Sequence, residues 1–169
     1  MQNELLRELE ARGFINQASN MDGLNEALNA GKIAAYWGTD PTGDSLHVGH
    51  LASLMLMRWF QKYGHKPITL VGGATGRIGD PSGRDKGRPM LTDEQIEKNC
   101  AGLRKSIEKF INFDDGNAIM VDNYDWMKNY SHLDFLRDFG TDFTVPRMLS
   151  MDSVKRRLDN GMTFLEFNY

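Results

Sequence analysis

A stretch near the start of the chain joins a strand, a tight turn and a helix, and it constrains the fold more than any other feature. The run Ile33–Trp37 is short and apolar, as in a buried strand, and the polar residues Asp40–Gly43 follow it as a turn. A helix with apolar residues three and four positions apart begins at His47. Because a strand, a turn and a helix in this order open a βαβ unit, the stretch predicts a parallel sheet.

The same alternation continues along the rest of the chain. Two further apolar runs have the length of strands, at Pro67–Val71 and Ala118–Val121. Helical patterns lie at 5–30 (with interruptions near Gly13 and Asn20), 47–63, 92–110, 132–138 and 152–158, and a capping box of Thr163 and Glu166 begins another helix. We therefore predict the α/β class, with a parallel sheet, right-handed crossovers and helices on both faces. Ligands of such sheets bind at the carboxyl ends of the strands.

Composition limits the classes of protein to which the chain can belong. The chain has 169 residues, of which 40% are hydrophobic and 25% charged, as in one ordinary globular domain. No run is long and apolar enough to span a bilayer, and the N-terminus lacks the pattern of a signal peptide. The net charge of −3 argues against a broad basic face for nucleic acid.

The single cysteine, Cys100, excludes an internal disulfide and fits a reducing cytoplasm, where we expect the protein to be located. Cys100, His65 and His132 lack the spacing of zinc ligands. No metal site is therefore predicted.

The helix start at His47 has the chemistry of an anion site. A helix N-terminus presents unpaired N–H groups and a partial positive charge, both of which favour phosphate. His47 and His50 are three residues apart and share one helix face, while Gly49 leaves room for a base or a ribose against the backbone. The pattern indicates an ATP site, although histidines in these positions can also simply cap or pack the helix.

Several sequence blocks resemble one family. The motif His47-Val48-Gly49-His50 is similar to the His-Ile-Gly-His signature of class I aminoacyl-tRNA synthetases, and the longer run 36–50 resembles its tyrosyl-tRNA synthetase version. The blocks 71–83, 123–126 and 164–169 resemble bacterial tyrosyl-tRNA synthetases in order and spacing. The resemblance implies an N-terminal fragment with a Rossmann-like catalytic domain. It comprises a helical segment at 1–30 and part of the catalytic domain at 31–169.

The resemblance also implies a reaction. The carboxylate of L-tyrosine attacks the α-phosphate of ATP, which arrives with Mg²⁺ as a substrate, and the tyrosyl group of the adenylate then passes to tRNA(Tyr). The attacking carboxylate is already ionised, so positioning and charge stabilisation must carry the rate without a general base or a prosthetic group. The implied enzyme is an ATP-dependent tyrosine–tRNA ligase.

The resemblance assigns most of the catalytic groups to the phosphates of ATP. Thr42 and His47 correspond to family residues that contact the departing phosphates. His50 corresponds to a residue beside the ribose and phosphate, and Arg84 and Arg88 align with cations that a loop places against pyrophosphate. From the residues alone, this loop can equally be a solvated charged segment.

Three glycine and aspartate positions are implied in nucleotide binding. Gly49 matches a position under the adenine, Gly38 one where the backbone approaches the adenylate, and Asp40 one near the nucleotide and the substrate amine. From the residues alone, Asp40 simply belongs to a good turn. Trp37 stands where family members often carry a smaller residue that touches the ribose, so we assign it no role in the site.

Three residues are implied in tyrosine binding. Tyr36 lies where the family recognises the phenol hydroxyl, and a site built to pair with a hydroxyl rejects phenylalanine. Asp80 and Tyr169 match positions that hold the ammonium group, for which a carboxylate and a phenol oxygen are suitable acceptors. From the residues alone, Asp80 before Pro81 can be a turn. A second phenol partner of the family, an aspartate, would follow Tyr169.

Two features of the family do not occur in these residues: the Lys-Met-Ser-Lys-Ser-type loop that closes on ATP, and the anticodon-binding domain. In bacterial members the tRNA contacts lie largely in later domains and in the second subunit of a homodimer. We therefore expect a fragment with weak activity or none, from a parent enzyme that is a homodimer.

Three other functions stay open at this point. A tryptophanyl-tRNA synthetase is the nearest, but Tyr36 and the blocks 72–82 and 123–126 favour tyrosine. A small nucleotidyltransferase would keep the histidines and use a different second substrate. A noncatalytic binding module is disfavoured by the joint presence of Thr42, Asp80 and both histidines.

Overall fold

The computed structural model describes residues 2–79, 90–158 and 161–169. The strands in this part of the chain are β1 (Ala34–Thr39), β2 (Lys66–Val71) and β3 (Ile119–Asp122). The helices are α1 (Glu4–Ala11), α2 (Met21–Ala30), α3 (Val48–Lys62), α4 (Thr75–Ile78), α5 (Asp93–Ile107), α6 (Tyr124–Met127), α7 (His132–Asp138), α8 (Val145–Leu149), α9 (Asp152–Leu158) and α10 (Phe164–Phe167), with a 3₁₀ turn, η1 (Asp114–Gly116).

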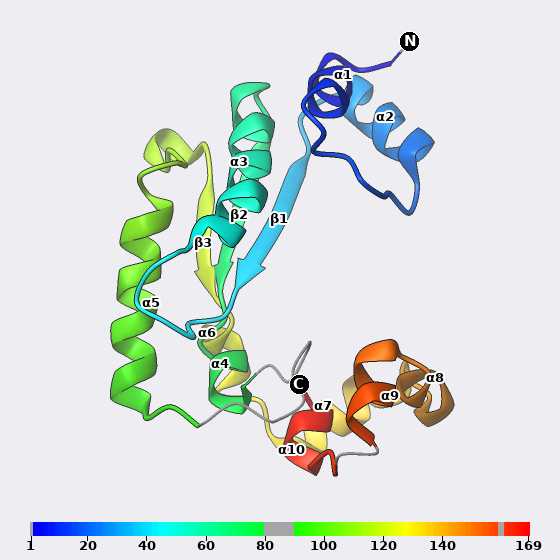
Figure 1. Cartoon of the computed structure of the whole chain (residues 1–169), viewed down its shortest axis with the longest axis vertical. Helices are drawn as coiled ribbons and strands as arrows, with labels where there is room; N and C mark the ends of the chain where they lie inside the picture. Colours follow the sequence, from blue (N-terminus) through cyan, green and yellow to red (C-terminus); the bar gives the residue numbers. More distant parts are fainter. Residues whose placement is uncertain (1, 80–89, 159–160) are drawn as a thin grey trace.

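The strands form one parallel sheet in the order β1-β2-β3 (Figure 1). In its register, Ile68 of β2 lies between Tyr36 of β1 and Ile119 of β3. Helix α3 connects β1 to β2, and α5 lies on the connection from β2 to β3. The described chain thus contains two successive βαβ units, and the prediction of an α/β chain with a parallel sheet is confirmed.

The hydrophobic core lies between one face of the sheet and the helices α1, α3 and α5. Its fully buried members include Leu54 of α3, Val71 of β2 and Ile107 of α5. Trp37 packs against this core, whereas its neighbour Tyr36 is 65% exposed. Successive strand residues point to opposite faces of a sheet, so Trp37 faces the core and Tyr36 faces the uncovered side.

The opposite face of the sheet carries Tyr36, Ile68, Leu70 and Ile119, and no helix of the described residues packs along it. Right-handed crossovers between strands added in the order 1-2-3 place successive helices on the same side, which accounts for α3 and α5 sharing one face. The expected second layer of helices is therefore not found among the residues that the structure describes.

Local capping signals agree with the observed helix ends. The Thr92 hydroxyl accepts a hydrogen bond from the Gln95 amide at the start of α5, and Thr163 and Glu166 form a reciprocal capping box at the start of α10. Gly64 adopts a φ of 84° directly after α3, a left-handed conformation that favours glycine. The predicted helices at 92–110 and at the chain end are confirmed in kind, with α5 ending at Ile107.

Three short helices, α4, α6 and α8, were not predicted from the sequence. Each has four or five residues, which is too short for an apolar repeat of 3.6 residues to be recognised. Two of them, α4 and α6, begin within a few residues of the ends of β2 and β3. They therefore lie at the edge of the sheet where a ligand of this fold class would bind.

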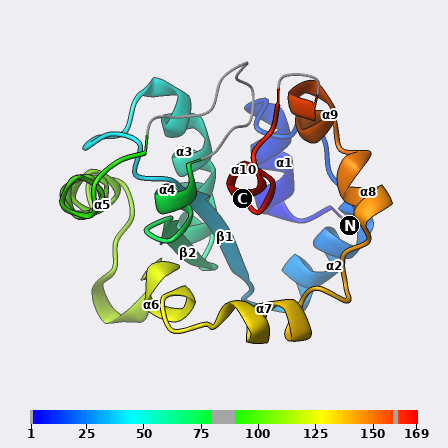
Figure 2. The ribbon, with the colours of Figure 1, turned by 90° about the horizontal axis from the view of Figure 1, so that it is seen from below.

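Helices α7 to α10 lie beyond the carboxyl ends of the strands, at the opposite end of the molecule from α1 and α2 (Figure 1). Seen from below, α10 and the C-terminus lie near the middle of the view, with α8 and α9 farther out (Figure 2). None of the helices in the described ranges combines the length and the apolar character needed to cross a bilayer.

His65 precedes β2 and is a buried titratable group, with 8% of its surface exposed. Its Nδ1 accepts a hydrogen bond from the main-chain N–H of Ile33, at 3.3 Å. Burial lowers the pKa of His65, and the nearby charge of Lys32 lowers it further. Because the pKa in the folded chain lies below that in the unfolded chain, the neutral ring contributes stability that is complete above about pH 6.5 and is lost as the pH falls.

We expect the free energy of unfolding to fall between about pH 7 and about pH 5, and to fall less in a His65→Asn variant. The amide oxygen of that variant can accept from Ile33 in place of Nδ1 and does not titrate. Urea unfolding of the 169-residue chain at both pH values measures the difference. His132→Asn, at an exposed position of α7, is the control and should keep the wild-type pH dependence. The same pH dependence in His65→Asn as in wild type would contradict the assignment.

Candidate active site

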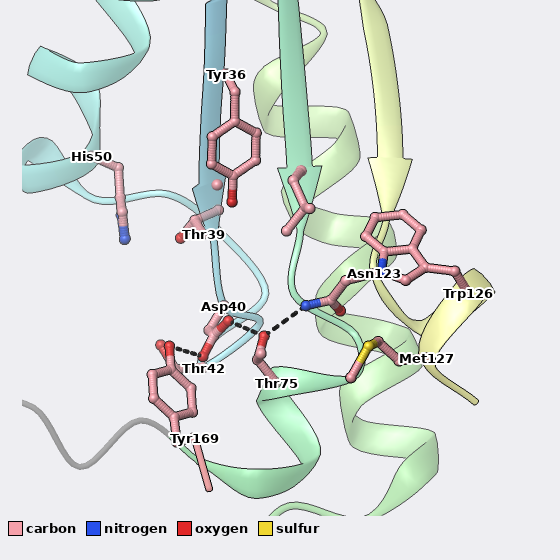
Figure 3. A pocket seen from close by; sticks show the side chains of 12 residues that line it. Tyr36, Thr39, Asp40, Thr42, His50, Thr75, Asn123, Trp126, Met127 and Tyr169 are labelled. Carbon is pink, nitrogen blue, oxygen red and sulfur yellow. Dashed lines mark hydrogen bonds between the residues drawn. The ribbon is translucent and has the colours of Figure 1, made fainter. Parts of the chain in front are cut away.

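A cavity of about 560 Å³ lies at the carboxyl ends of the three strands (Figure 3). Six residues that the sequence analysis assigned to the site line this cavity: Tyr36, Gly38, Asp40, Thr42, His50 and Tyr169. Six further lining residues were not predicted: Thr39, Leu70, Thr75, Asn123, Trp126 and Met127. The cavity thus combines the ends of all three strands with the start of α3 and the last residue of the chain.

The turn after β1 is held in place from α5. The side-chain amide of Asn99, which is buried, donates to the main-chain oxygen of Pro41 at 2.9 Å. Within the turn, the amide of Thr42 donates to the main-chain oxygen of Asp40 at 2.9 Å. These bonds fix the two polar side chains that the turn contributes to the cavity, those of Asp40 and Thr42.

The turn after β2 needs glycine because side chains press directly against its backbone. A Cβ atom at Gly72 would lie 2.0 Å from an Asp40 oxygen, and one at Gly73 would lie 2.3 Å from an Asp122 oxygen. No larger residue can be accommodated at either distance. The amide of Gly73 uses this approach to donate to Asp122 at 3.1 Å.

Asp122, at the end of β3, ties this turn to two other elements. Its carboxylate accepts from the amide of Tyr124 at 3.0 Å and from the guanidinium of Arg104 on α5 at 3.1 Å. With the bond from Gly73, one carboxylate therefore joins the ends of β2 and β3 to the helix between them. The charged bond to Arg104 offsets part of the cost of holding Asp122 away from water.

Asp40 is the polar centre of the cavity. One of its oxygens accepts from the hydroxyl of Thr75 at 2.7 Å, and the other accepts from the hydroxyl of Tyr169 at 2.9 Å. Asn123 donates in turn to Thr75 at 3.1 Å. Asp40 therefore connects the turns after β1 and β2 with the C-terminal residue.

The two histidines cap α3 through a reciprocal pair of hydrogen bonds. Nδ1 of His47 accepts from the amide of Gly49 at 3.0 Å, and Nδ1 of His50 accepts from the amide of His47 at 3.3 Å. Their ring centroids are 3.9 Å apart. Burial lowers the pKa of His50, and the neighbouring His47 lowers it further, so this ring is more strongly kept neutral than a free histidine.

The residues at the start of α3 differ in whether they line the cavity. His50 lines the cavity, whereas His47 and Gly49 do not. A Cβ atom at Gly49 would lie 2.8 Å from Cε1 of His47, so this glycine makes room for the histidine ring over the helix start. The two histidines therefore do cap the helix, which was the alternative interpretation. The cap uses their Nδ1 atoms, so the Nε2 atoms are available for other contacts.

Tyr36 and Gly38 are two residues apart on β1 and lie on the face of the sheet opposite to the core. A Cβ atom at Gly38 would lie 2.8 Å from the Tyr36 hydroxyl, so the glycine gives the phenol ring its space along β1. This packing reason differs from the predicted approach of the backbone to a nucleotide. Trp37, which was given no role, faces the core and does not line the cavity.

Three predicted site residues, Asp80, Arg84 and Arg88, lie outside the described residues. In the ranges that the structure does describe, no three side chains of histidine, cysteine, aspartate or glutamate gather as metal ligands would.

Several lining residues that were not predicted lie in sequence blocks that directly follow strands. Thr75 belongs to the glycine-rich block that follows β2, and Asn123 and Trp126 belong to the block that follows β3. Since polar residues directly after parallel strands meet at one edge of the sheet, their positions alone could have placed them in the cavity.

Comparisons with known proteins agree with this arrangement. The family model described as "tRNA synthetases class I (W and Y)" matches residues 28–169. The tyrosine–tRNA ligase of Rhodospirillum rubrum is 51% identical over 170 residues, which cover 98% of this chain and 41% of that protein. The tyrosine–tRNA ligase of Clostridium tetani is 47% identical over 169 residues, covering 100% of this chain and 42% of that protein.

Among solved structures, a C-terminally truncated mitochondrial tyrosyl-tRNA synthetase from Aspergillus nidulans superposes with a TM-score of 0.87 at 31% identity. The match covers 99% of this chain and 51% of that one. The chain spans about two fifths of the length of the curated relatives named above. Because the family match runs from residue 28 to residue 169 and includes β1, β2, β3 and the cavity, the chain belongs to the family of class I tRNA synthetases described as "W and Y".

Proposed function

We propose that the protein to which this chain belongs is a tyrosine–tRNA ligase that forms tyrosyl-adenylate from L-tyrosine and ATP and passes the tyrosyl group to tRNA(Tyr). The observation that carries the proposal is the cavity itself. It brings the Tyr36 hydroxyl, the Asp40–Tyr169 pair and His50 at the start of α3 to one edge of a parallel sheet. A phenol, an ammonium group and a nucleotide phosphate each have a matching partner in that set.

In the proposed first step, an oxygen of the tyrosine carboxylate forms a bond to the α-phosphorus of ATP. The bond from that phosphorus to the bridging oxygen breaks, and pyrophosphate leaves with Mg²⁺. No proton has to be removed from the nucleophile, so the protein contributes position and charge stabilisation. Thr42 and His47 donate to the departing phosphates, and His50 lies by the ribose and α-phosphate.

The remaining residues are proposed to hold the substrates. Tyr36 pairs with the phenol hydroxyl, while Asp80 and Tyr169 receive the ammonium group. Gly38, Asp40 and Gly49 adjoin the nucleotide, and Arg84 and Arg88 neutralise pyrophosphate. The division into a helical segment at 1–30 and a catalytic part at 31–169 is proposed with them, although α1 shares the core of the sheet.

Tyrosine is favoured over tryptophan as the substrate because a phenol side chain, Tyr36, lines the cavity and is 65% exposed, and its neighbours on the same face of β1, Ala34 and Gly38, are small. The Tyr36 hydroxyl can form a hydrogen bond with the phenol hydroxyl of a tyrosine substrate. The indole of tryptophan has no hydroxyl. Tyrosine-dependent exchange of pyrophosphate into ATP by the full-length gene product tests the proposal. Exchange that depends on tryptophan, or no exchange with either amino acid, would contradict it.

We also propose that the full-length protein is a cytoplasmic homodimer whose tRNA contacts lie largely outside these residues. The support for a dimer is a group of exposed apolar side chains on and beside α7 and α8. Leu133 is 71% exposed, Phe143 58% and Val145 57%. Such an apolar surface is typical of an interface between subunits.

Replacing Thr42 with alanine, or His47 with asparagine, should slow adenylate formation by about a hundredfold or more with little change in tyrosine affinity. Each change removes a proposed donor to the transition state, a loss of about 2.7–4 kcal/mol at comparable sites. Asparagine keeps an acceptor for the helix cap, so α3 should stay intact. Single-turnover adenylation by the full-length protein is the measurement, with Val48→Ala, at an exposed position beside His47, as the control. An unchanged rate would remove both residues from the reaction.

Tyr36→Phe should reduce the preference for tyrosine over phenylalanine, because it deletes a hydroxyl partner and leaves the ring in place. The ratio of activation efficiencies for the two amino acids is expected to fall by about tenfold, from a loss of about 1–3 kcal/mol. Pyrophosphate exchange with each amino acid measures this ratio. A wild-type ratio together with lower stability would make Tyr36 a packing residue.

Leu133→Asp and Phe143→Asp should each shift the full-length protein from dimer toward monomer, because a charge on a buried apolar contact costs several kcal/mol. Sedimentation equilibrium measures the state of association. Lys105→Asp, on the exposed side of α5, is the control and should leave it unchanged. Dimers of wild-type stability in both variants would show that this surface has another use.

A further inference from the structure

Asn123 and Thr75, which the reaction proposed above does not use, form a directed chain of hydrogen bonds that runs to Asp40, to which Tyr169 donates from the other side (Figure 3). A main-chain amide fixes the orientation of the first side chain, that of Asn123. The main-chain N–H of Ala74 donates to Oδ1 of Asn123 at 2.7 Å, so the side-chain amide can only be oriented with Nδ2 on the other side. That Nδ2 donates to Oγ1 of Thr75 at 3.1 Å.

The hydroxyl of Thr75 has a single hydrogen to give. Since Oγ1 receives a hydrogen from Asn123, its own hydrogen is directed to an acceptor, and the shorter of its two contacts is Oδ1 of Asp40 at 2.7 Å. The other contact, to the main-chain oxygen of Gly72, is 3.4 Å long. One oxygen of Asp40 is therefore held by Thr75, which turns the second oxygen toward the C-terminal residue.

That second oxygen, Oδ2, accepts from the hydroxyl of Tyr169 at 2.9 Å. A carboxylate accepts hydrogens and gives none, so the Tyr169 hydrogen is directed at Asp40. The phenol oxygen then acts as an acceptor toward the cavity that it lines. A hydroxyl free to rotate would instead present its hydrogen for part of the time, and a hydrogen repels a cationic ligand.

We propose that Asn123 and Thr75 are positioning residues for the ammonium group of the amino-acid substrate, acting through the orientation of Asp40 and the direction of the Tyr169 hydrogen bond. The inference rests on the proposed function, since it assumes an amino acid in the cavity. Asn123 is buried, with 8% of its surface exposed, so water does not readily replace its amide. Its effect reaches the substrate without contact between Asn123 and the ammonium group.

Three variants of the full-length protein test the chain of bonds. Thr75→Val keeps the shape of the side chain and removes its hydroxyl, while Thr75→Ser keeps the hydroxyl and is the matched control. Asn123→Asp keeps the shape and the acceptor for Ala74 but places an acceptor against Thr75. The Thr75 hydrogen would then turn away from Asp40, which reverses the direction of the chain.

Calorimetric binding of two ligands separates positioning from a general structural role. L-Tyrosine carries the ammonium group, and 3-(4-hydroxyphenyl)propanoate has the same ring and carboxylate without it. Thr75→Val and Asn123→Asp are expected to weaken tyrosine binding by about tenfold or more, as for a lost hydrogen bond to a charged group. Binding of the propanoate should change by less than about twofold, and Thr75→Ser should match wild type for both ligands.

Equal weakening of both ligands in Thr75→Val, or no weakening of tyrosine, would overturn the inference. If Asn123→Asp does not fold, the Thr75 pair decides alone, because valine keeps the volume of the side chain and serine, with one methyl group fewer, keeps its hydroxyl. A wild-type protein that binds the propanoate analogue and tyrosine equally would also overturn it. Absence of any tyrosine binding by the wild-type protein would instead overturn the proposed function on which it rests.

Discussion

The close approach of the backbone after β2 to two carboxylates determines the geometry of the cavity. At Gly72 and Gly73 the main chain passes so near to Asp40 and Asp122 that any Cβ atom would overlap a carboxylate oxygen. This approach lets backbone and hydroxyl donors of one turn reach acidic groups that come from the two neighbouring strands. The ends of β1, β2 and β3 are thus joined by side chains beyond the last bonds of the sheet. A larger residue at either glycine would displace the carboxylates or the turn, because its Cβ atom would overlap a carboxylate oxygen.

Most of the regular structure could be predicted from the sequence. The long helices and the strands have apolar repeats and capping residues of their own, and 132–138 and 152–158 have the predicted bounds. The short helices α4 and α6 could not be predicted, because four residues show no repeat and their positions depend on contacts with distant parts of the chain. That α3 and α5 cover the same face of the sheet among the described residues could not be predicted for a similar reason. A pattern shows that a helix has an apolar side, but not which face of the sheet it covers.

The candidate site was predictable in part, and for different reasons at different residues. Asp40, Thr42 and His50 follow from the rule that loops after parallel strands meet at one edge. Tyr169 could be placed only through the resemblance, since a tyrosine after a four-residue helix has no pattern of its own. Thr75 and Asn123 were missed although they follow strands, because their importance lies in bonds to each other and to Asp40 across 35 to 48 residues. The roles of Asp80, Arg84 and Arg88 stay predictions.

The hydrogen bond between Tyr169 and Asp40 joins residues 129 positions apart and attaches the last helix to the first strand. Helix α10 has four residues and is held further by the Arg157–Glu166 ion pair, whose side chains are 6% and 10% exposed. None of residues 161–169 is buried, so this segment opens at a lower free energy than the core of the sheet. A ligand that bridges Asp40 and Tyr169 would add its binding energy to the closed form, so we expect amides of α10 to exchange hydrogen more slowly when the cavity is filled. The last turn of the chain would then report occupancy of a site whose other lining residues lie between positions 36 and 127.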